Sequence, residues 1–254
     1  MADEPRPMIP GRQAPPPKPK RFYASATAEP RDGGHALLLD GRAAKTPAKR
    51  TLALPSKAAG EAVAAEWNAQ VAVIDPALMP LTRIANTAID GVGEQMSAVA
   101  AEVKTYLGSD LLLYRAGTPA SLFEAEAAAW DPVLAWVREA FGVRFILAEG
   151  ITFVTQPDTT IAALGEVVDA VVGEGAAAPF RLAALHVMTT LTGSALLALA
   201  VLHGRLTPEE AWAAALVDEL FQESQWGSDD EALERRERRW ADMRAAATTG
   251  LLAG

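Results

Sequence analysis

The pattern of apolar and polar positions divides the chain into a short β-like part and a long helical part. Between residues 21 and 55, short apolar runs alternate with turn residues, and Asp40-Gly41 is a strong signal for a two-residue hairpin. From residue 56 onward, most apolar residues recur at helical spacing. We therefore expect an α+β fold, with a small N-terminal antiparallel β-rich domain and a larger all-helical C-terminal domain.

The same pattern predicts three segments along the chain. Residues 1–20 contain seven prolines and no apolar run, which is typical of a disordered proline-rich tail rather than of a secretory signal. Residues 21–75 are expected to form the β-rich N-terminal domain, and residues 76–254 the helical domain. Within the helical domain, two β-rich runs flank Glu149-Gly150 and predict a β-hairpin at about residues 143–155.

The run from Leu182 to Gly204 has 23 residues without a formal charge, a length that would also span a bilayer. Eight of these residues are His, Thr, Ser or Gly, and Gly193 lies in the middle of the run. Small residues of this kind favour close helix packing in a protein core. A buried central helix is therefore the preferred interpretation, and a membrane span is the alternative.

Two helix starts follow one another between residues 207 and 244. Thr207 is placed to cap the first helix, and Glu210 three residues later completes a capping box. Gly227 is a stop signal, and Ser228 with Glu231 repeats the capping pattern. We expect one continuous helix before Gly227 and a second helix after it.

The charge in this region is lopsided. The segment 207–231 has eight carboxylates and no Lys, Arg or His, whereas the whole chain has a net charge of −9. Five of the eight lie in predicted first turns, where the helix dipole favours anions by about 0.3–1 kcal/mol each. The predicted helix gives no such reason for Asp218, Glu219 and Glu223. These three either keep a surface solvated or meet cations on another molecule.

Trp226 is predicted to lie at the end of the first helix, beside these carboxylates. An aromatic side chain next to charges is a common anchor in interfaces, although the indole could equally pack onto the core as a lid. Trp212, Leu216 and Leu220 are spaced four residues apart and are expected to form the buried stripe of the helix.

Composition and motifs point away from several kinds of chemistry. The chain has no Cys, which removes disulfides, thiolate metal sites and Cys nucleophiles, and its acidic balance argues against nucleic-acid binding. Phosphate-binding glycine motifs and HExxH do not occur, so neither a cofactor nor a metal ion is expected. A binding module fits best, and a small-molecule enzyme with an acidic active site or a peripheral membrane protein are the alternatives.

Several ordered blocks of residues between 21 and 240 form a recognisable pattern. The C-terminal block has Asp218-Glu219, Gln222, Trp226-Gly227, Asp230-Glu231-Ala232 and Arg235. The earlier blocks are RFY at 21–23, DGRAAKTP at 40–47, ALP at 53–55, EWNAQ at 66–70, MPLT at 79–82, TAID at 87–90 and WDP at 130–132. Together they resemble the Atp12 family of F1-ATPase assembly chaperones, although Glu126 stands where Gln is usual.

The resemblance implies a non-enzymatic chaperone that holds the newly made α subunit of F1 until it pairs with β. It also implies a monomer in the bacterial cytoplasm, with no nucleic-acid partner and no stable membrane insertion. A Glu in the C-terminal block matters for function in the family, and Glu219 is the matching position. The predicted partner-binding residues are Asp218, Glu219, Gln222, Glu223, Trp226 and Asp230.

Overall fold

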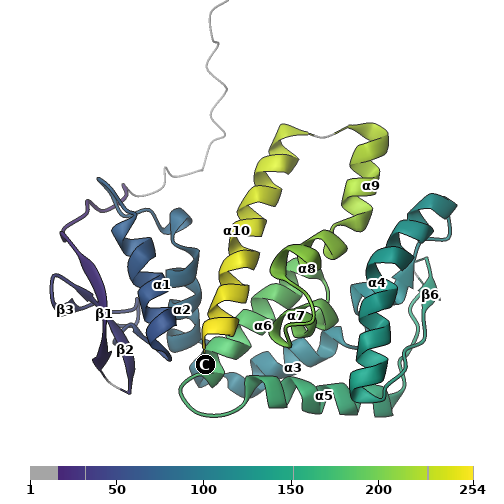
Figure 1. Cartoon of the computed structure of the whole chain (residues 1–254), viewed down its shortest axis with the longest axis horizontal. Helices are drawn as coiled ribbons and strands as arrows, with labels where there is room; N and C mark the ends of the chain where they lie inside the picture. Colours follow the sequence, from purple (N-terminus) through teal and green to yellow (C-terminus); the bar gives the residue numbers. More distant parts are fainter. Residues whose placement is uncertain (1–16, 32, 151, 228, 254) are drawn as a thin grey trace, which may run out of the picture.

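The computed structural model describes residues 17–31, 33–150, 152–227 and 229–253, and these form an α+β fold (Figure 1). A small antiparallel sheet lies at one end of the molecule, and helices make up most of the rest. The predicted fold class is therefore confirmed. The predicted tail falls mostly in residues 1–16, outside the described part of the chain, and the domain boundary after residue 75 stays a prediction.

The sheet is built around its longest buried strand. Strand β2 (Gly34–Leu39) pairs antiparallel with β1 (Ala26–Arg31), β3 (Arg42–Ala43) and β4 (Ala53–Leu54). Asp40 and Gly41 connect β2 to β3 with φ values of 48° and 79°. Two consecutive positive φ angles define the type I′ turn that favours hairpins, so the predicted hairpin is present.

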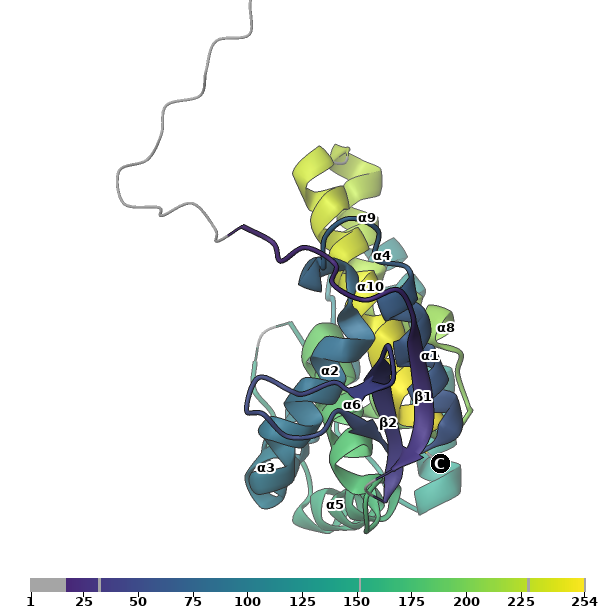
Figure 2. The ribbon, with the colours of Figure 1, turned by 90° about the vertical axis from the view of Figure 1, so that its left-hand side faces the viewer.

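Helix α1 (Lys57–Asn68) covers the sheet, as the view onto the sheet shows (Figure 2). Gly60 permits the close approach, because a Cβ atom there would lie only 2.8 Å from the Cβ atom of Ala28. The hydroxyl of Ser56 caps α1 by accepting a hydrogen bond from the amide of Ala59, and it donates to the carbonyl of Leu252. The helix that covers the sheet is thereby tied to the C-terminal end of the chain.

The other helices pack around a buried central pair, α6 (Ala178–Thr192) and α7 (Ala195–Leu202). They are α2 (Pro80–Asp90), α3 (Met96–Tyr106), α4 (Ala120–Phe141), α5 (Asp158–Val172), α8 (Pro208–Ala215), α9 (Val217–Trp226) and α10 (Asp230–Leu252). Helix α6 packs against α10 and α7, while α1 and α2 lie between this centre and the sheet (Figure 1). Every residue from Ala195 to Val201 is at most 1% exposed, so α7 lies wholly in the core.

The uncharged run from Leu182 to Gly204 is buried, as preferred, but it forms two helices rather than one. Gly193 ends α6 with φ at 69°, and the side chain of Ser194 caps α7 by accepting from the amide of Leu197. Both pieces are short. Within the described residues, no helix is long and apolar enough to cross a membrane.

A buried carboxylate fixes this break. Asp110 is fully buried, and its oxygens accept from the amides of Leu112 (3.1 Å) and Leu196 (3.0 Å), the second at the start of α7. The amide of Leu111 also donates to the carbonyl of Gly193. Burial raises the pKa of Asp110 from 3.8 to about 6, although the hydrogen bonds it accepts favour the charged form.

Helix α4 begins after Pro119 and continues through Pro132 without interruption. Asp131, just before this proline, forms an ion pair with Arg115 at 2.7 Å.

The predicted hairpin at residues 143–155 is wrong. Strand β6 (Ala148–Glu149) pairs in parallel with β5 (Tyr114–Arg115), far away in sequence. The arms before and after Gly150 are joined by a side chain, because the amide group of Gln156 bonds both the N–H and the C=O of Ile146. A side chain that imitates a strand partner cannot be recognised from a β-rich pattern. Ile151, inside the predicted hairpin, lies outside the described residues.

Replacing Asp110 with Ala is expected to lower the free energy of unfolding by about 2–4 kcal/mol, because two buried N–H groups lose their acceptor. The pKa of this carboxyl is raised in the folded state, so its contribution to stability is greatest below its ordinary pKa of 3.8 and falls as pH rises through about 6. Denaturant unfolding should therefore show a larger difference between wild type and variant near pH 4 than near pH 7. A difference that grows with pH would contradict this account.

Candidate functional site

Helices α8 and α9 replace the single helix predicted from Thr207 to Trp226. The predicted capping box is present, since Thr207 accepts from the amide of Glu210 (3.1 Å) and the Glu210 carboxylate accepts from the amide of Thr207 (2.8 Å). The chain then breaks at Leu216, and α9 begins at Val217. Asp218 and Glu219 consequently lie in a first turn, where the helix dipole favours them.

The break also changes which side chains are buried. Trp212 and Leu216 are buried as expected, but Leu220 is 44% exposed, and the expectation for it is wrong. Helix α9 has no buried residue at all, because it leaves the body and projects beside the N-terminal half of α10 (Figure 1).

Arginines of α10 hold α9 in place. Nη1 of Arg236 lies 2.8 Å from Glu223 Oε1 and 3.6 Å from Glu219 Oε1, and Arg239 lies 3.9 Å from Glu219. Two of the three unexplained acids are therefore matched inside the chain. Their presence does not by itself require a cation on another molecule.

Arg239 also fixes α10 to the body. Its Nη2 donates to the carbonyl of Leu191 at 2.8 Å, and its guanidinium lies 5.4 Å from the ring centre of Trp212. One side chain thus contacts α6, α8 and α9 together, so the positions of these helices depend on one another.

The third acid, Asp218, faces another carboxylate rather than an arginine. Its neighbour is Glu126 of α4, which is only 2% exposed and accepts from the amide of Ala116 at 2.8 Å. Burial raises the pKa of Glu126, and the nearby Asp218 raises it further, while Arg115 opposes the shift. Protonated Glu126 can donate a hydrogen bond to Asp218, whereas the ionised form repels it.

A groove of about 390 Å³ lies between α9 and α10. It is lined by Glu219, Gln222, Glu223, Trp226, Gly227, Asp229, Ala232, Arg235, Arg236 and Arg239. Trp226 stands on it with 85% of its surface exposed, so the alternative of a lid on the core does not hold. Four predicted partner-binding residues line the groove, whereas Asp218 faces α4 and Asp230 lies in the first turn of α10.

The arginines of the groove were not among the predicted site residues. The sequence does carry a signal for them, the run ERRERR at 234–239 that follows the acidic segment. Arg235 has no carboxylate partner in the described part of the chain. The start of α10 also differs from prediction, because Asp229 caps it by accepting from the amide of Glu231, and Ser228 lies outside the described residues.

An exposed tryptophan on a half-open groove with charges of both signs is the composition of a protein-binding surface. In the residues that the structure describes, no group of three His, Asp or Glu side chains is placed to hold a metal ion. The fold and the groove thus define an α+β protein with an exposed tryptophan on a charged groove. Comparison with known proteins makes this class more specific.

Residues 20–138 match the family model of the ATP12 chaperone protein. The crystal structure of Atp12 from Paracoccus denitrificans is 40% identical with a TM-score of 0.84, over 93% of this chain and 99% of that one. A proposed chaperone from Agrobacterium tumefaciens is 46% identical with a TM-score of 0.88, over 93% and 87%. The chain belongs to the ATP12 chaperone family. The resemblance noted in the sequence is confirmed.

Replacing Glu126 with Gln is expected to stabilise the protein by about 1 kcal/mol near neutral pH, or about 2–4 °C in Tm. Gln keeps an acceptor for the amide of Ala116 and removes the repulsion from Asp218. Because the pKa of Glu126 is raised in the folded state, the glutamate contributes stability below its ordinary pKa of 4.5 and loses it as pH rises. The advantage of Gln should therefore disappear below about pH 4.5 in thermal unfolding.

The matched control is Asp218→Asn, which relieves the same repulsion from the other side. The double variant should gain less than the sum of the two single gains, because both remove one interaction. Fully additive gains would show that the two carboxyl groups do not interact.

Proposed function

We propose that this protein is a chaperone for assembly of the F1 sector of ATP synthase, and that it binds the unassembled α subunit until α pairs with β. Membership of the ATP12 chaperone family supports the assembly role. The observation that carries the binding role is Trp226, a large aromatic side chain held almost fully in solvent on a charged groove. Exposed aromatic area of this kind contributes most when a partner covers it.

The groove is suited to temporary binding. A subunit without its neighbour exposes apolar surface, which favours aggregation. Trp226 and the half-exposed Leu220 provide apolar contacts on α9, and the surrounding charges orient the client rather than add much affinity. Because the apolar part is small, the native partner β can displace the chaperone by offering a larger interface.

The internal ion pairs give the groove its shape before a client arrives. Arg236 is mostly buried between Glu219 and Glu223, so α9 is held at a fixed distance from α10. Glu219 is only loosely paired, at 3.6 and 3.9 Å, and retains the capacity to accept from a cation on the client. Arg235 is available for an acidic group of the client on the opposite wall.

Capture of separately expressed F1 α and β subunits tests this proposal. Wild type should retain α, whereas Trp226→Ala and Glu219→Lys should weaken retention by about 10- to 30-fold, as expected for the loss of a hot-spot residue. Trp226 is exposed, so its replacement should change thermal unfolding little, whereas Glu219→Lys also removes the loose ion pairs to Arg236 and Arg239 and should lower Tm slightly.

The matched controls lie at the other end of the molecule. Phe22→Ala removes an exposed aromatic, and Glu61→Lys reverses an exposed carboxylate on α1. Both should retain α as wild type does. Retention of β instead of α would refute the choice of client, and full retention by both groove variants would refute the choice of surface.

A charge exchange separates the internal role of the carboxylates from contact with the client. The double variant Glu223→Arg/Arg236→Glu preserves an ion pair between α9 and α10 but reverses the charges that a client meets. If charged groups of the client contact these side chains, retention of α should fall by about 10-fold while Tm stays near that of wild type. Unchanged retention would mean that the charges act only within the chain.

A further inference from the structure

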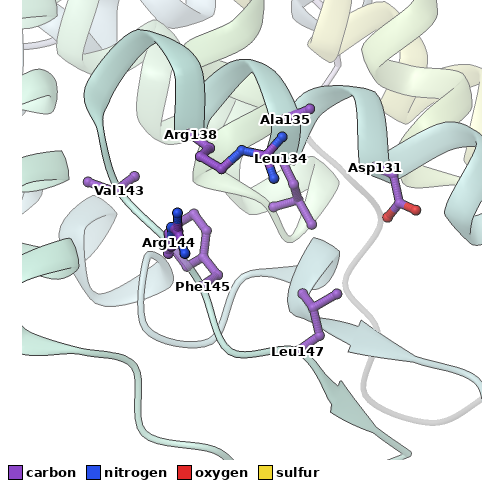
Figure 3. A pocket seen from close by; sticks show the side chains of 8 residues that line it. All are labelled: Asp131, Leu134, Ala135, Arg138, Val143, Arg144, Phe145 and Leu147. Carbon is purple, nitrogen blue, oxygen red and sulfur yellow. The ribbon is translucent and has the colours of Figure 1, made fainter.

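A second groove, with a volume of about 610 Å³, lies between α4 and the segment that follows it (Figure 3). Its walls are α4 and the segment that follows it, with the side chains of Asp131, Leu134, Ala135, Arg138, Val143, Arg144, Phe145 and Leu147. Apolar side chains thus come from both walls. None of the predicted partner-binding residues lies here.

One edge of the segment 143–149 is occupied by hydrogen bonds. The carbonyl of Arg144 accepts from Thr160, and Ile146 bonds the side chain of Gln156 through both its N–H and its C=O. Further along, β6 pairs with β5, and the amide of Gly150 donates to the carbonyl of Arg115. These bonds recur at alternate, even-numbered residues, which is the periodicity of an extended chain.

The other edge is open. Phe145 and Leu147, the odd-numbered residues between these bonds, form no backbone hydrogen bond in the described parts of the chain. In an extended segment their N–H and C=O groups point away from the occupied edge. An open edge of this kind is a template for one more strand.

Apolar side chains on both sides of Gly150 remain exposed to solvent. Ile146 and Leu147, in the segment with the open edge, are each 47% exposed, and Phe153, after Gly150, is 66% exposed. Three large exposed apolar residues within eight positions exceed what a solvated loop needs. Together these features indicate a surface that a partner covers.

The charges of the groove specify the partner. Arg138 and Arg144 form no ion pair with a carboxylate among the described residues, whereas Asp131 is already matched by Arg115. The position of Arg138 in the last turn of α4 accounts for one cation, since the helix dipole favours it there. Arg144 has no such reason. The unmatched charges of this groove are therefore positive.

We propose that the groove between α4 and residues 143–147 binds an extended segment of the client that carries both apolar and acidic residues on one face. The segment adds as a strand to the backbone of Phe145 and Leu147, and this face enters the groove, where its carboxylates meet Arg138 and Arg144. The proposal rests on the proposed function and adds a second contact on the same client.

Peptides of 12 residues that overlap along the F1 α sequence, each with a fluorescent label, test the proposal by anisotropy with the full chain. A peptide that carries both apolar and acidic residues at every second position, and so on one face of a strand, should bind. The double variant Arg138→Glu/Arg144→Glu should weaken this binding at least 10-fold, whereas Trp226→Ala, in the other groove, should leave it unchanged. Methylation of the peptide's amide nitrogens should abolish binding at every second residue only, because one edge of a strand pairs.

Two results overturn the proposal and are distinguishable from each other. If intact α is retained but no α peptide binds, or if methylation acts without alternation, strand addition is wrong while the chaperone role stands. If intact α is not retained by wild type, the proposed function fails and this inference fails with it.

Discussion

The close packing of α10 on the centre of the molecule is the contact on which the rest depends. At Gly250 a Cβ atom would lie 2.6 Å from Cδ2 of Leu202 and 3.1 Å from Cβ of Ala184, so glycine lets α10 approach without displacing these side chains. The C-terminal half of α10 is buried among small residues, while its N-terminal half is charged and projects with α9. A helix of 23 residues, about 34 Å long, therefore carries the α9–α10 groove on a base fixed in the core.

The same base joins the two parts of the fold. Ser56 caps the helix that covers the sheet and also bonds the last turn of α10, which connects the sheet region to the helix that carries the groove. Arg239 then links α10 to α6, α8 and α9 by contacting Leu191, Trp212 and Glu219. The groove is consequently positioned by the core, although none of its lining residues is fully buried in that core.

The sequence predicted features that depend on neighbours within a few residues. The capping box at Thr207 and Glu210 and the turn at Asp40-Gly41 are local, so their patterns were sufficient. The ion pairs of Arg236 are not local. They form only because the break at Leu216 gives α9 a direction that brings it beside α10. Gln156 misled the prediction for a related reason, since a side-chain amide took the place that the β-rich pattern assigned to a strand.

The contacts of α9 explain how this helix can have a defined position and still be easily displaced. No residue of α9 is buried, so its position depends on partly exposed ion pairs to α10 and on the carboxyl pair of Asp218 and Glu126 at α4. Exposed ion pairs contribute little each, typically about 0.2–1 kcal/mol, and the carboxyl pair opposes docking when both groups are ionised. Helix α9 is therefore one of the less stable parts of the structure, which is typical of elements that adapt to a partner. In the proposed function, a client that covers Trp226 would move α9 without disturbing the core, and the same weakness would limit how tightly that client is held.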